Sequence, residues 1–198
     1  MGKRSKAKEL TRQKILDSAK RAFIENGFMA LSTVDVAKSA GIAHGTVFFH
    51  FESKEALLTE MLQRELLIIT GRLYERLSGS ADIETMLVTY LDSLQTQELF
   101  FSVLARETPF YSPELRRAVL GYEAGSRSYF CNALEREIAV GRCKNVSVTT
   151  TIGILFGALS YYLSMRDSFS DGSSVIAEKK QTIIETFMAL IRKDMDNE

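Results

Sequence analysis

The sequence TVDVAKSAGIAHGTVFFHFE, residues 33–52, predicts two short helices joined by a glycine turn. Val36 and Ala37 lie on the inner face of the first helix, and the small Ala37 leaves room for a second helix that crosses it closely. Gly41 follows at the position where a left-handed backbone ends a helix, a conformation that glycine adopts at little cost. This order of small, apolar and turn residues is typical of a helix-turn-helix.

The residues around this segment support the same motif. Ser32 is a candidate N-cap, with Asp35 as the acid of a capping box and Leu31 as a hydrophobic staple. Ile42 and Val47 supply the inner face of the second helix. Because the second helix of such motifs enters the major groove of DNA, the segment indicates nucleic-acid binding.

Charge is unevenly distributed along a chain whose formal net charge is zero. Residues 1–64 contain 11 Lys and Arg against 7 Asp and Glu, and the rest of the chain has an equal excess of acidic residues. The first 21 residues alone hold 8 basic and 2 acidic side chains. A basic arm beside a helix-turn-helix suits phosphate binding, although a solvated terminus has the same composition.

Composition bounds the class of protein. The chain has 198 residues, of which 45% are hydrophobic and 25% charged, with no Trp and two Pro, as expected of a helix-rich globular protein. Cys131 and Cys143 are 12 residues apart and have no histidine near them, so we expect neither a metal cluster nor a disulfide scaffold. We also expect no cofactor.

The N-terminal charges are not followed by an apolar segment, so we expect no signal peptide and a cytoplasmic location. Residues 145–165 carry no charge, but they include seven Ser, Thr and Asn residues. This composition favours a buried or interfacial helix over a membrane span.

Apolar residues recur at helical spacing through nearly the whole chain. The pattern predicts a first helix over Leu10–Asn26 that ends at Gly27, and a long helix that starts at a Ser53 cap. A Ser-Gly-Ser break at residues 78–80 ends this long helix, and further helices follow to the C-terminus. Because the β-branched segment near residue 148 has no hairpin turn beside it, we predict an all-α fold.

The run AGIAHGTVFFHFESKEALL, residues 40–58, resembles the DNA-binding domain of the tetracycline-repressor (TetR) family of transcriptional regulators. In that family a Gly-apolar pair precedes a small polar residue, Gly-Thr-apolar, an aromatic cluster with Phe, and a Ser-Lys-Glu-Ala-Leu helix start. The chain matches this pattern with Gly41-Ile42, Ala43-His44, Gly45-Thr46-Val47, Phe48-Phe49-His50-Phe51 and Ser53-Lys54-Glu55-Ala56-Leu57. The resemblance covers about the first 65 residues, and beyond them it extends only to the architecture.

The resemblance implies two domains. Residues 1–52 would form a three-helix helix-turn-helix domain, with the start of a connector helix to about residue 65, and residues 66–198 a helical effector-binding and dimerisation domain. The boundary falls inside the connector helix, which implies mechanical coupling between the two.

The same resemblance implies the DNA-binding residues, with His44 and Thr46 at base edges or phosphates and Lys54 and Thr33 at phosphates. His50 has an alternative role as a packing residue. Phe48 stands where the family commonly has tyrosine and so offers no hydroxyl, which leaves the operator sequence unpredictable. The full candidate set is Thr33, Ala43, His44, Gly45, Thr46, Phe48, Phe49, His50 and Lys54.

The C-terminal helices are expected to dimerise, because two recognition helices about 34–36 Å apart would reach successive major grooves. The candidate interface residues are Gly153, Phe156, Gly157, Ile184, Phe187, Met188 and Ile191. The alternative is that these helices only fill the core of one subunit.

Aromatic residues crowd the middle of the chain and suggest a pocket for a small apolar or amphipathic effector. The candidate lining residues are Phe100, Phe101, Arg106, Phe110, Tyr111, Tyr122, Tyr129, Phe156 and Tyr161. The predicted function is therefore a repressor that binds a palindromic double-stranded DNA operator as a homodimer and is released by its effector.

Two other classes of protein fit the sequence less well. An all-α enzyme with an aromatic pocket is disfavoured because the sequence offers no catalytic triad arrangement, metal spacing or phosphate loop. A nonspecific architectural DNA-binding protein would need a net positive chain, whereas the C-terminal part here is acidic.

Overall fold

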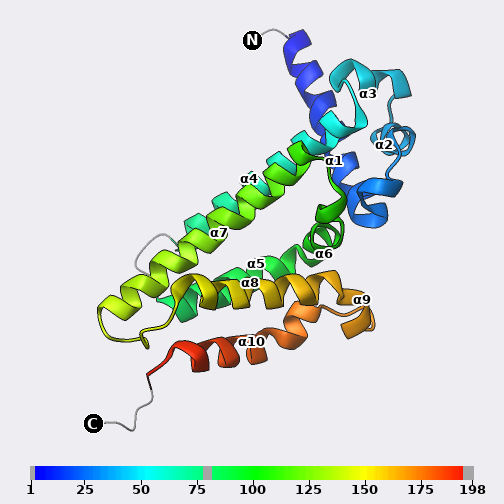
Figure 1. The fold of residues 1–198 in the computed structure, drawn as a ribbon. Coiled ribbons are helices and arrows are strands. Elements are labelled where there is room, and N and C mark those ends of the chain that lie inside the picture. Colours follow the sequence, from blue (N-terminus) through cyan, green and yellow to red (C-terminus); the bar gives the residue numbers. More distant parts are fainter. Residues whose placement is uncertain (1–2, 78–81, 194–198) are drawn as a thin grey trace. The chain divides into compact units, whose positions relative to one another are not determined.

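The computed structural model describes residues 3–77 and 82–193, and within these ranges the regular elements are helices plus one isolated bridge between Cys143 and Arg192 (Figure 1). The predicted all-α fold is confirmed. The expected break at residues 78–80 lies outside the described ranges.

Four helices form the N-terminal part of the chain: α1 (Lys3–Ala30), α2 (Thr33–Ala40), α3 (His44–His50) and α4 (Lys54–Leu77). α1 begins before the expected Leu10, because residues 6–10 are mostly strong helix formers that continue the helix toward the terminus. At the other end, Gly27 interrupts α1 with φ 75° and ψ 177°. The predicted role of Gly27 as a helix breaker is confirmed.

The remaining elements are α5 (Ile83–Thr96), α6 (Glu98–Glu107), the 3₁₀ turn η1 (Thr108–Phe110), α7 (Pro113–Ala139), α8 (Val148–Ser164), α9 (Arg166–Phe169) and α10 (Val175–Ile191). The β-branched segment that begins at Val148 is helical, since burial of its apolar face outweighs local strand propensity. Asp82 and Ser174 cap α5 and α10 by accepting hydrogen bonds from backbone N–H groups of the first turns.

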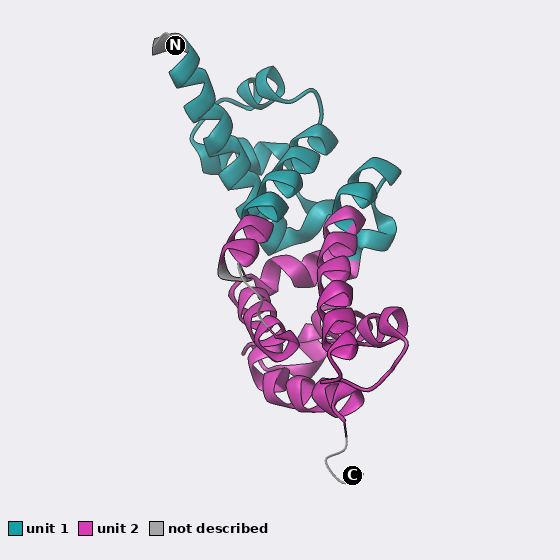
Figure 2. Cartoon of the chain, turned by 90° about the vertical axis from the view of Figure 1, so that its left-hand side faces the viewer, with its two compact units in different colours: residues 1–68, 107–119 teal, residues 69–106, 120–198 magenta. Residues whose placement is uncertain are grey.

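The chain forms two compact units, coloured separately in Figure 2. Unit 1 consists of residues 1–68 and 107–119, and unit 2 of residues 69–106 and 120–198. Residues 107–119 thus belong to the same unit as the N-terminal helices, whereas the sequence predicts them in the C-terminal domain of residues 66–198.

Each unit has its own apolar core. In unit 1, α1 packs on α2 and α2 on α3, and the fully buried side chains include Ile15, Leu16, Phe23, Val36, Leu57, Leu58, Met61 and Leu62. In unit 2, α10 packs on α5 and α8, around a core that includes Met86, Leu87, Leu91, Phe100, Phe130, Leu134 and Val175.

Among the described residues, no helix combines the length and apolar character needed to cross a membrane. The same residues contain no group of three or more His, Cys, Asp or Glu side chains arranged to hold a metal ion.

Candidate nucleic-acid interface

The turn between α2 and α3 is built from two local signals in the sequence. The Ser32 hydroxyl accepts a hydrogen bond from the Val34 N–H at 3.2 Å and so caps α2. Gly41 ends α2 in the left-handed region, with φ 67° and ψ 38°, and its N–H bonds the Lys38 carbonyl. Both predicted caps are confirmed, and together they fix how α3 leaves α2.

α3 is a short helix with one buried face. Val47 is 1% exposed and anchors the helix to the core of unit 1. Phe48 and Phe49 are 46% and 70% exposed, although both are large apolar side chains. A helix that keeps one anchor residue and turns its aromatics outward is shaped for an external partner.

The predicted DNA-binding residues lie on or beside α3, except Thr33 at the start of α2 and Lys54 at the start of α4. Ala43, His44, Gly45, Phe48 and Phe49 are exposed, and Thr33, Thr46, His50 and Lys54 are half-buried.

A hydrogen bond joins the two helices of the motif at this face. Thr33 Oγ1 and His44 Nε2 lie 3.0 Å apart, and the His44 ring also meets the Phe48 ring edge-on at 5.1 Å. The His44 ring is therefore held in one orientation by contacts from α2 and from the next turn of α3.

Two basic residues of α1, Lys8 and Arg12, support the end of α3. Lys8 Nζ lies 5.2 Å from the centre of the Phe49 ring, and Arg12 donates a 2.7 Å hydrogen bond to the His50 carbonyl. Arg12 also stands over the Phe51 ring and pairs with Glu60. Neither residue is among the predicted DNA-binding residues, although both lie in the basic N-terminal run of the sequence.

His50 combines features of both roles considered for it. Its ring is half-buried, and its Nδ1 has no hydrogen-bond partner among the described residues. Burial, together with the positive charges of Lys8 and Arg12, lowers the pKa of His50 below its ordinary value of 6.5, while Glu9 opposes the shift. The neutral imidazole is thus favoured in the folded protein.

Lys54, the candidate phosphate contact at the start of α4, sits in a cradle made by the end of α1. Its Nζ donates to the Met29 carbonyl at 3.2 Å and lies 5.1 Å from the centre of the Phe28 ring. Burial lowers the pKa of Lys54, and the nearby Glu107 carboxylate offsets part of that shift. No local signal in the sequence links Glu107 to this site.

Several of the predicted effector-binding residues meet in an aromatic cluster in unit 2. The Phe101 and Tyr122 rings stack at 5.7 Å, and Tyr90 packs against both Phe130 and Phe156. Burial raises the pKa of Tyr122 to about 12 and that of Tyr90 well above its usual value.

Polar groups line the same cluster. Tyr90, Tyr122 and Ser126 interact through their hydroxyl groups. Arg127 pairs with Glu123 and stands over the Phe156 ring at 5.3 Å. Tyr90 and Arg127 are not among the predicted effector-binding residues, since an aromatic or basic residue carries no sign in the sequence of which helix face it occupies.

Of the other predicted effector residues, only Phe100 contacts a ring of this cluster among the described contacts. Phe110, 74% exposed, and Tyr111, buried, belong to unit 1. Arg106 is exposed and pairs with Asp167, and Tyr161 is 55% exposed beside Phe169. Tyr129 contacts the Tyr74 ring, and Phe100 is 1% exposed against Phe101.

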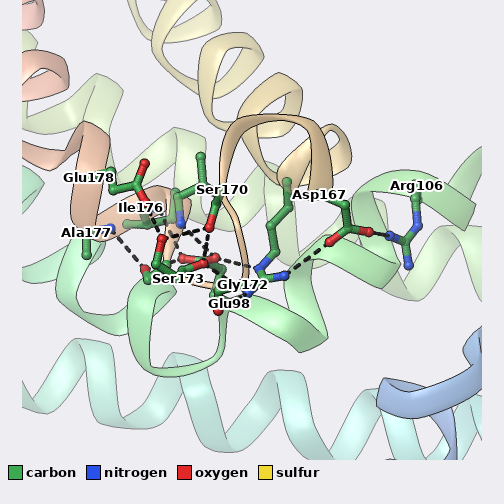
Figure 3. A network of polar contacts seen from close by, with 12 residues as sticks. Glu98, Arg106, Asp167, Ser170, Gly172, Ser173, Ile176, Ala177 and Glu178 are labelled. Carbon is green, nitrogen blue, oxygen red and sulfur yellow. Dashed lines mark hydrogen bonds and ion pairs between the residues drawn. The ribbon is translucent and has the colours of Figure 1, made fainter.

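A buried carboxylate holds the start of α10 in unit 2 (Figure 3). Glu98, 5% exposed, accepts hydrogen bonds from the N–H groups of Val175 and Ile176, both at 3.0 Å, and from the Ser174 hydroxyl. Arg166 donates to the same carboxylate at 2.8 Å. A negative charge at a helix N-terminus is favourable, so Glu98 fixes α6 to α10.

Most of the predicted dimer residues are buried within the subunit. Phe156, Ile184, Phe187, Met188 and Ile191 are at most 8% exposed, whereas Gly153 is half-buried and Gly157 exposed. A side chain buried in its own core offers little surface to a second chain. The surface that α8 and α10 do expose contains Ile154, at 56%, and Leu190, at 43%. It forms an apolar groove, and the predicted dimer residue Phe187 lies in its lining together with Leu155, Ala158, Tyr162, Thr182, Ile183 and Thr186.

The N-terminal helices define a helix-turn-helix protein of the DNA-binding class. Comparison with known proteins agrees: residues 15–61 match the family described as bacterial regulatory proteins, tetR family. Residues 15–61 thus carry the DNA-binding region of this family of transcriptional regulators.

The HTH-type transcriptional regulator UidR of Escherichia coli K12 is 36% identical over 76 residues. The match covers 38% of this chain and spans 39% of the length of UidR.

Solved structures share the fold over nearly the whole chain. A putative transcriptional regulator from Saccharomonospora viridis, in complex with choline, superposes with a TM-score of 0.82 at 18% identity and covers 94% of this chain and 100% of its own. The regulator FadR from Bacillus subtilis, in complex with stearoyl-CoA, gives a TM-score of 0.75 at 20% identity and covers 91% and 99%.

Proposed function

We propose that this chain is a transcriptional repressor that binds a palindromic operator as a homodimer in the cytoplasm and is released by a small-molecule effector. The observation that carries the proposal is the outer face of α3, where His44, Phe48 and Phe49 are exposed while Val47 anchors the helix. The basic run in α1 supports it, because positive charge beside a recognition helix neutralises phosphates.

We also propose the residue roles. His44 and Thr46 read base edges, Thr33 orients His44, and Lys54 binds a phosphate beside the N-terminus of α4. Phe48 and Phe49 make apolar contacts with thymine methyl groups or sugars. Residues 1–52, with the connector to about residue 65, form the DNA-binding domain in this proposal, and residues 66–198 the effector-binding and dimerisation domain.

The effector part of the proposal rests on the aromatic cluster of unit 2. Its rings provide apolar contact area, and the hydroxyls of Tyr90 and Tyr122, with Arg127, provide polar groups for one end of an amphipathic molecule. Two proteins of similar fold were solved with a small molecule bound, choline in one and stearoyl-CoA in the other. Release from DNA requires that the effector bind the two conformations of the repressor unequally.

Selection of duplexes from a random library tests the function. The full chain should enrich a palindromic sequence and keep it at salt concentrations that release random duplexes, because base contacts add to the phosphate contacts. Equal retention of every duplex would support the architectural alternative. Failure to retain any duplex at modest salt would refute the regulator.

A further inference from the structure

Glu107, the last residue of α6, is bound to the end of α1 within unit 1. Its Oε2 accepts a hydrogen bond from the Phe28 N–H at 2.7 Å. Its Oε1 lies 2.1 Å from where a Cβ on Gly27 would stand. The positive φ of Gly27 disfavours any residue with a Cβ, and a Cβ there would also push the carboxylate away from its place at the Phe28 N–H.

The backbone that Glu107 fixes is the same backbone that holds Lys54. Phe28 supplies the ring beneath the Lys54 ammonium, and Met29, the next residue, supplies the carbonyl that accepts its hydrogen bond. The Phe28 ring also contacts Tyr111 at 5.2 Å, which ties the cradle to residues 107–119 a second time.

An ammonium group has three N–H donors, and the Met29 carbonyl uses one of them. The cradle therefore orients Lys54 and leaves donors for a phosphate. A lysine side chain without such support has many rotamers, and their loss on binding would oppose the contact.

We propose that Glu107 is a positioning residue for the phosphate contact of Lys54, and that it acts through the backbone of Gly27 and Phe28. The proposal rests on the proposed DNA-binding function and adds to it a residue more than fifty positions away in the sequence. Glu107 does not touch DNA in this account.

The test measures affinity for a selected duplex as a function of salt, because each phosphate contact contributes about 0.9 to the slope of log K against log salt. Glu107→Gln removes the charge but keeps an oxygen that accepts from the Phe28 N–H, so its slope should equal that of the parent chain. Glu107→Ala removes the acceptor. It should bind about five- to tenfold more weakly than Glu107→Gln, with a slope shallower by about one.

The Lys54→Met background separates positioning from a general structural effect. Lys54→Met alone should make the slope shallower by about one, and adding Glu107→Ala should then change nothing further. Glu114, an exposed glutamate of the same 107–119 segment, provides the charge-matched control, since Glu114→Ala should leave the slope unchanged. Glu107→Asp keeps the charge but shortens the side chain, so it should also make the slope shallower. It tests the positioning role if Glu107→Ala does not fold.

An unchanged slope in Glu107→Ala, or in Glu107→Asp where Glu107→Ala does not fold, would overturn the proposal while leaving the regulator intact. An equal loss of affinity from Glu107→Ala with and without Lys54 would do the same. If the parent chain retains no duplex, the proposed function itself is refuted, which is a different outcome from any of these.

Discussion

Thr46 is the residue whose substitution best separates base readout from phosphate contact. It lies half-buried on α3, one residue before the anchor Val47. Thr46→Ala should weaken binding to the selected operator by about 1–3 kcal/mol and leave binding to random duplexes nearly unchanged, because a base contact is lost. Competition binding with singly substituted operators measures the effect. An equal loss on cognate and random DNA would contradict the assigned role.

His50 gives the DNA-binding helices a predicted pH dependence. Its folded pKa lies below the ordinary 6.5, so the unfolded chain binds the proton more readily than the folded one. Stability should therefore be retained above about pH 6.5 and fall as the pH drops from 6.5 toward the folded pKa. Urea unfolding across this range should show a smaller fall for His50→Gln. Parallel curves for the parent and the variant would exclude His50 as the source.

At the scale of elements, Gly27 and Gly41 both end helices with positive φ but differ in their surroundings. A Cβ on Gly41 meets nothing within 4 Å, so Gly41→Ala should cost only its left-handed conformation, about 1–2 kcal/mol. Gly27→Ala should cost more, because its backbone is strained for any L-residue and the Cβ meets the Glu107 carboxylate. Denaturant unfolding measures both. Equal losses of stability in the two variants would show that the Glu107 carboxylate moves aside at little energetic cost.

The buried Glu98 should matter more to stability than any surface ion pair. Glu98→Ala leaves Arg166, whose side chain is 14% exposed, without this partner and removes the acceptor of two N–H groups in α10. We expect a loss of about 3–5 kcal/mol, as for other broken buried pairs. The pair Arg192–Glu84 is largely exposed and makes a control, since Glu84→Ala should cost less than about 1 kcal/mol.

The features of these elements that the sequence predicts correctly are helix ends and turns formed by residues close together in the chain. Ser32, Gly41 and Gly27 act within a few residues of themselves, so turn and cap chemistry locates them. Glu98 and Glu107 form hydrogen bonds with residues 68 to 79 positions away. No pattern near either glutamate in the sequence predicts which residues these are. The helical pattern likewise marks the apolar stripes of α8 and α10 but does not say which stripe faces the core. The predicted interface residues Phe187 and Ile191 are 3% and 0% exposed within the subunit, and Phe187 also lines the apolar groove between α8 and α10.

At the scale of the whole molecule, sequence-specific binding requires two copies of α3 related by two-fold symmetry in the proposed function. One short recognition helix contacts few base pairs, whereas two helices held one turn of duplex apart double the contacts and select a palindrome. We propose the exposed apolar groove of α8 and α10 as the surface for a second copy, because exposed apolar residues on two packed helices gain from mutual burial.

Ile154→Glu tests this surface, since Ile154 is 56% exposed and its replacement does not disturb the core. In a symmetric interface the substitution is introduced on both sides, so two carboxylates would be buried near each other and association should fail. Light scattering after size exclusion should then report a monomer with the helical signal of the parent, and affinity for the palindrome should fall to that for a half-site. Leu99, 50% exposed on α6 in the same unit, is the matched control, and Leu99→Glu should leave the dimer intact. A dimer that survives Ile154→Glu would place the interface on another face of the subunit, and the palindromic operator would then have to be read from a different pairing of the two α3 helices.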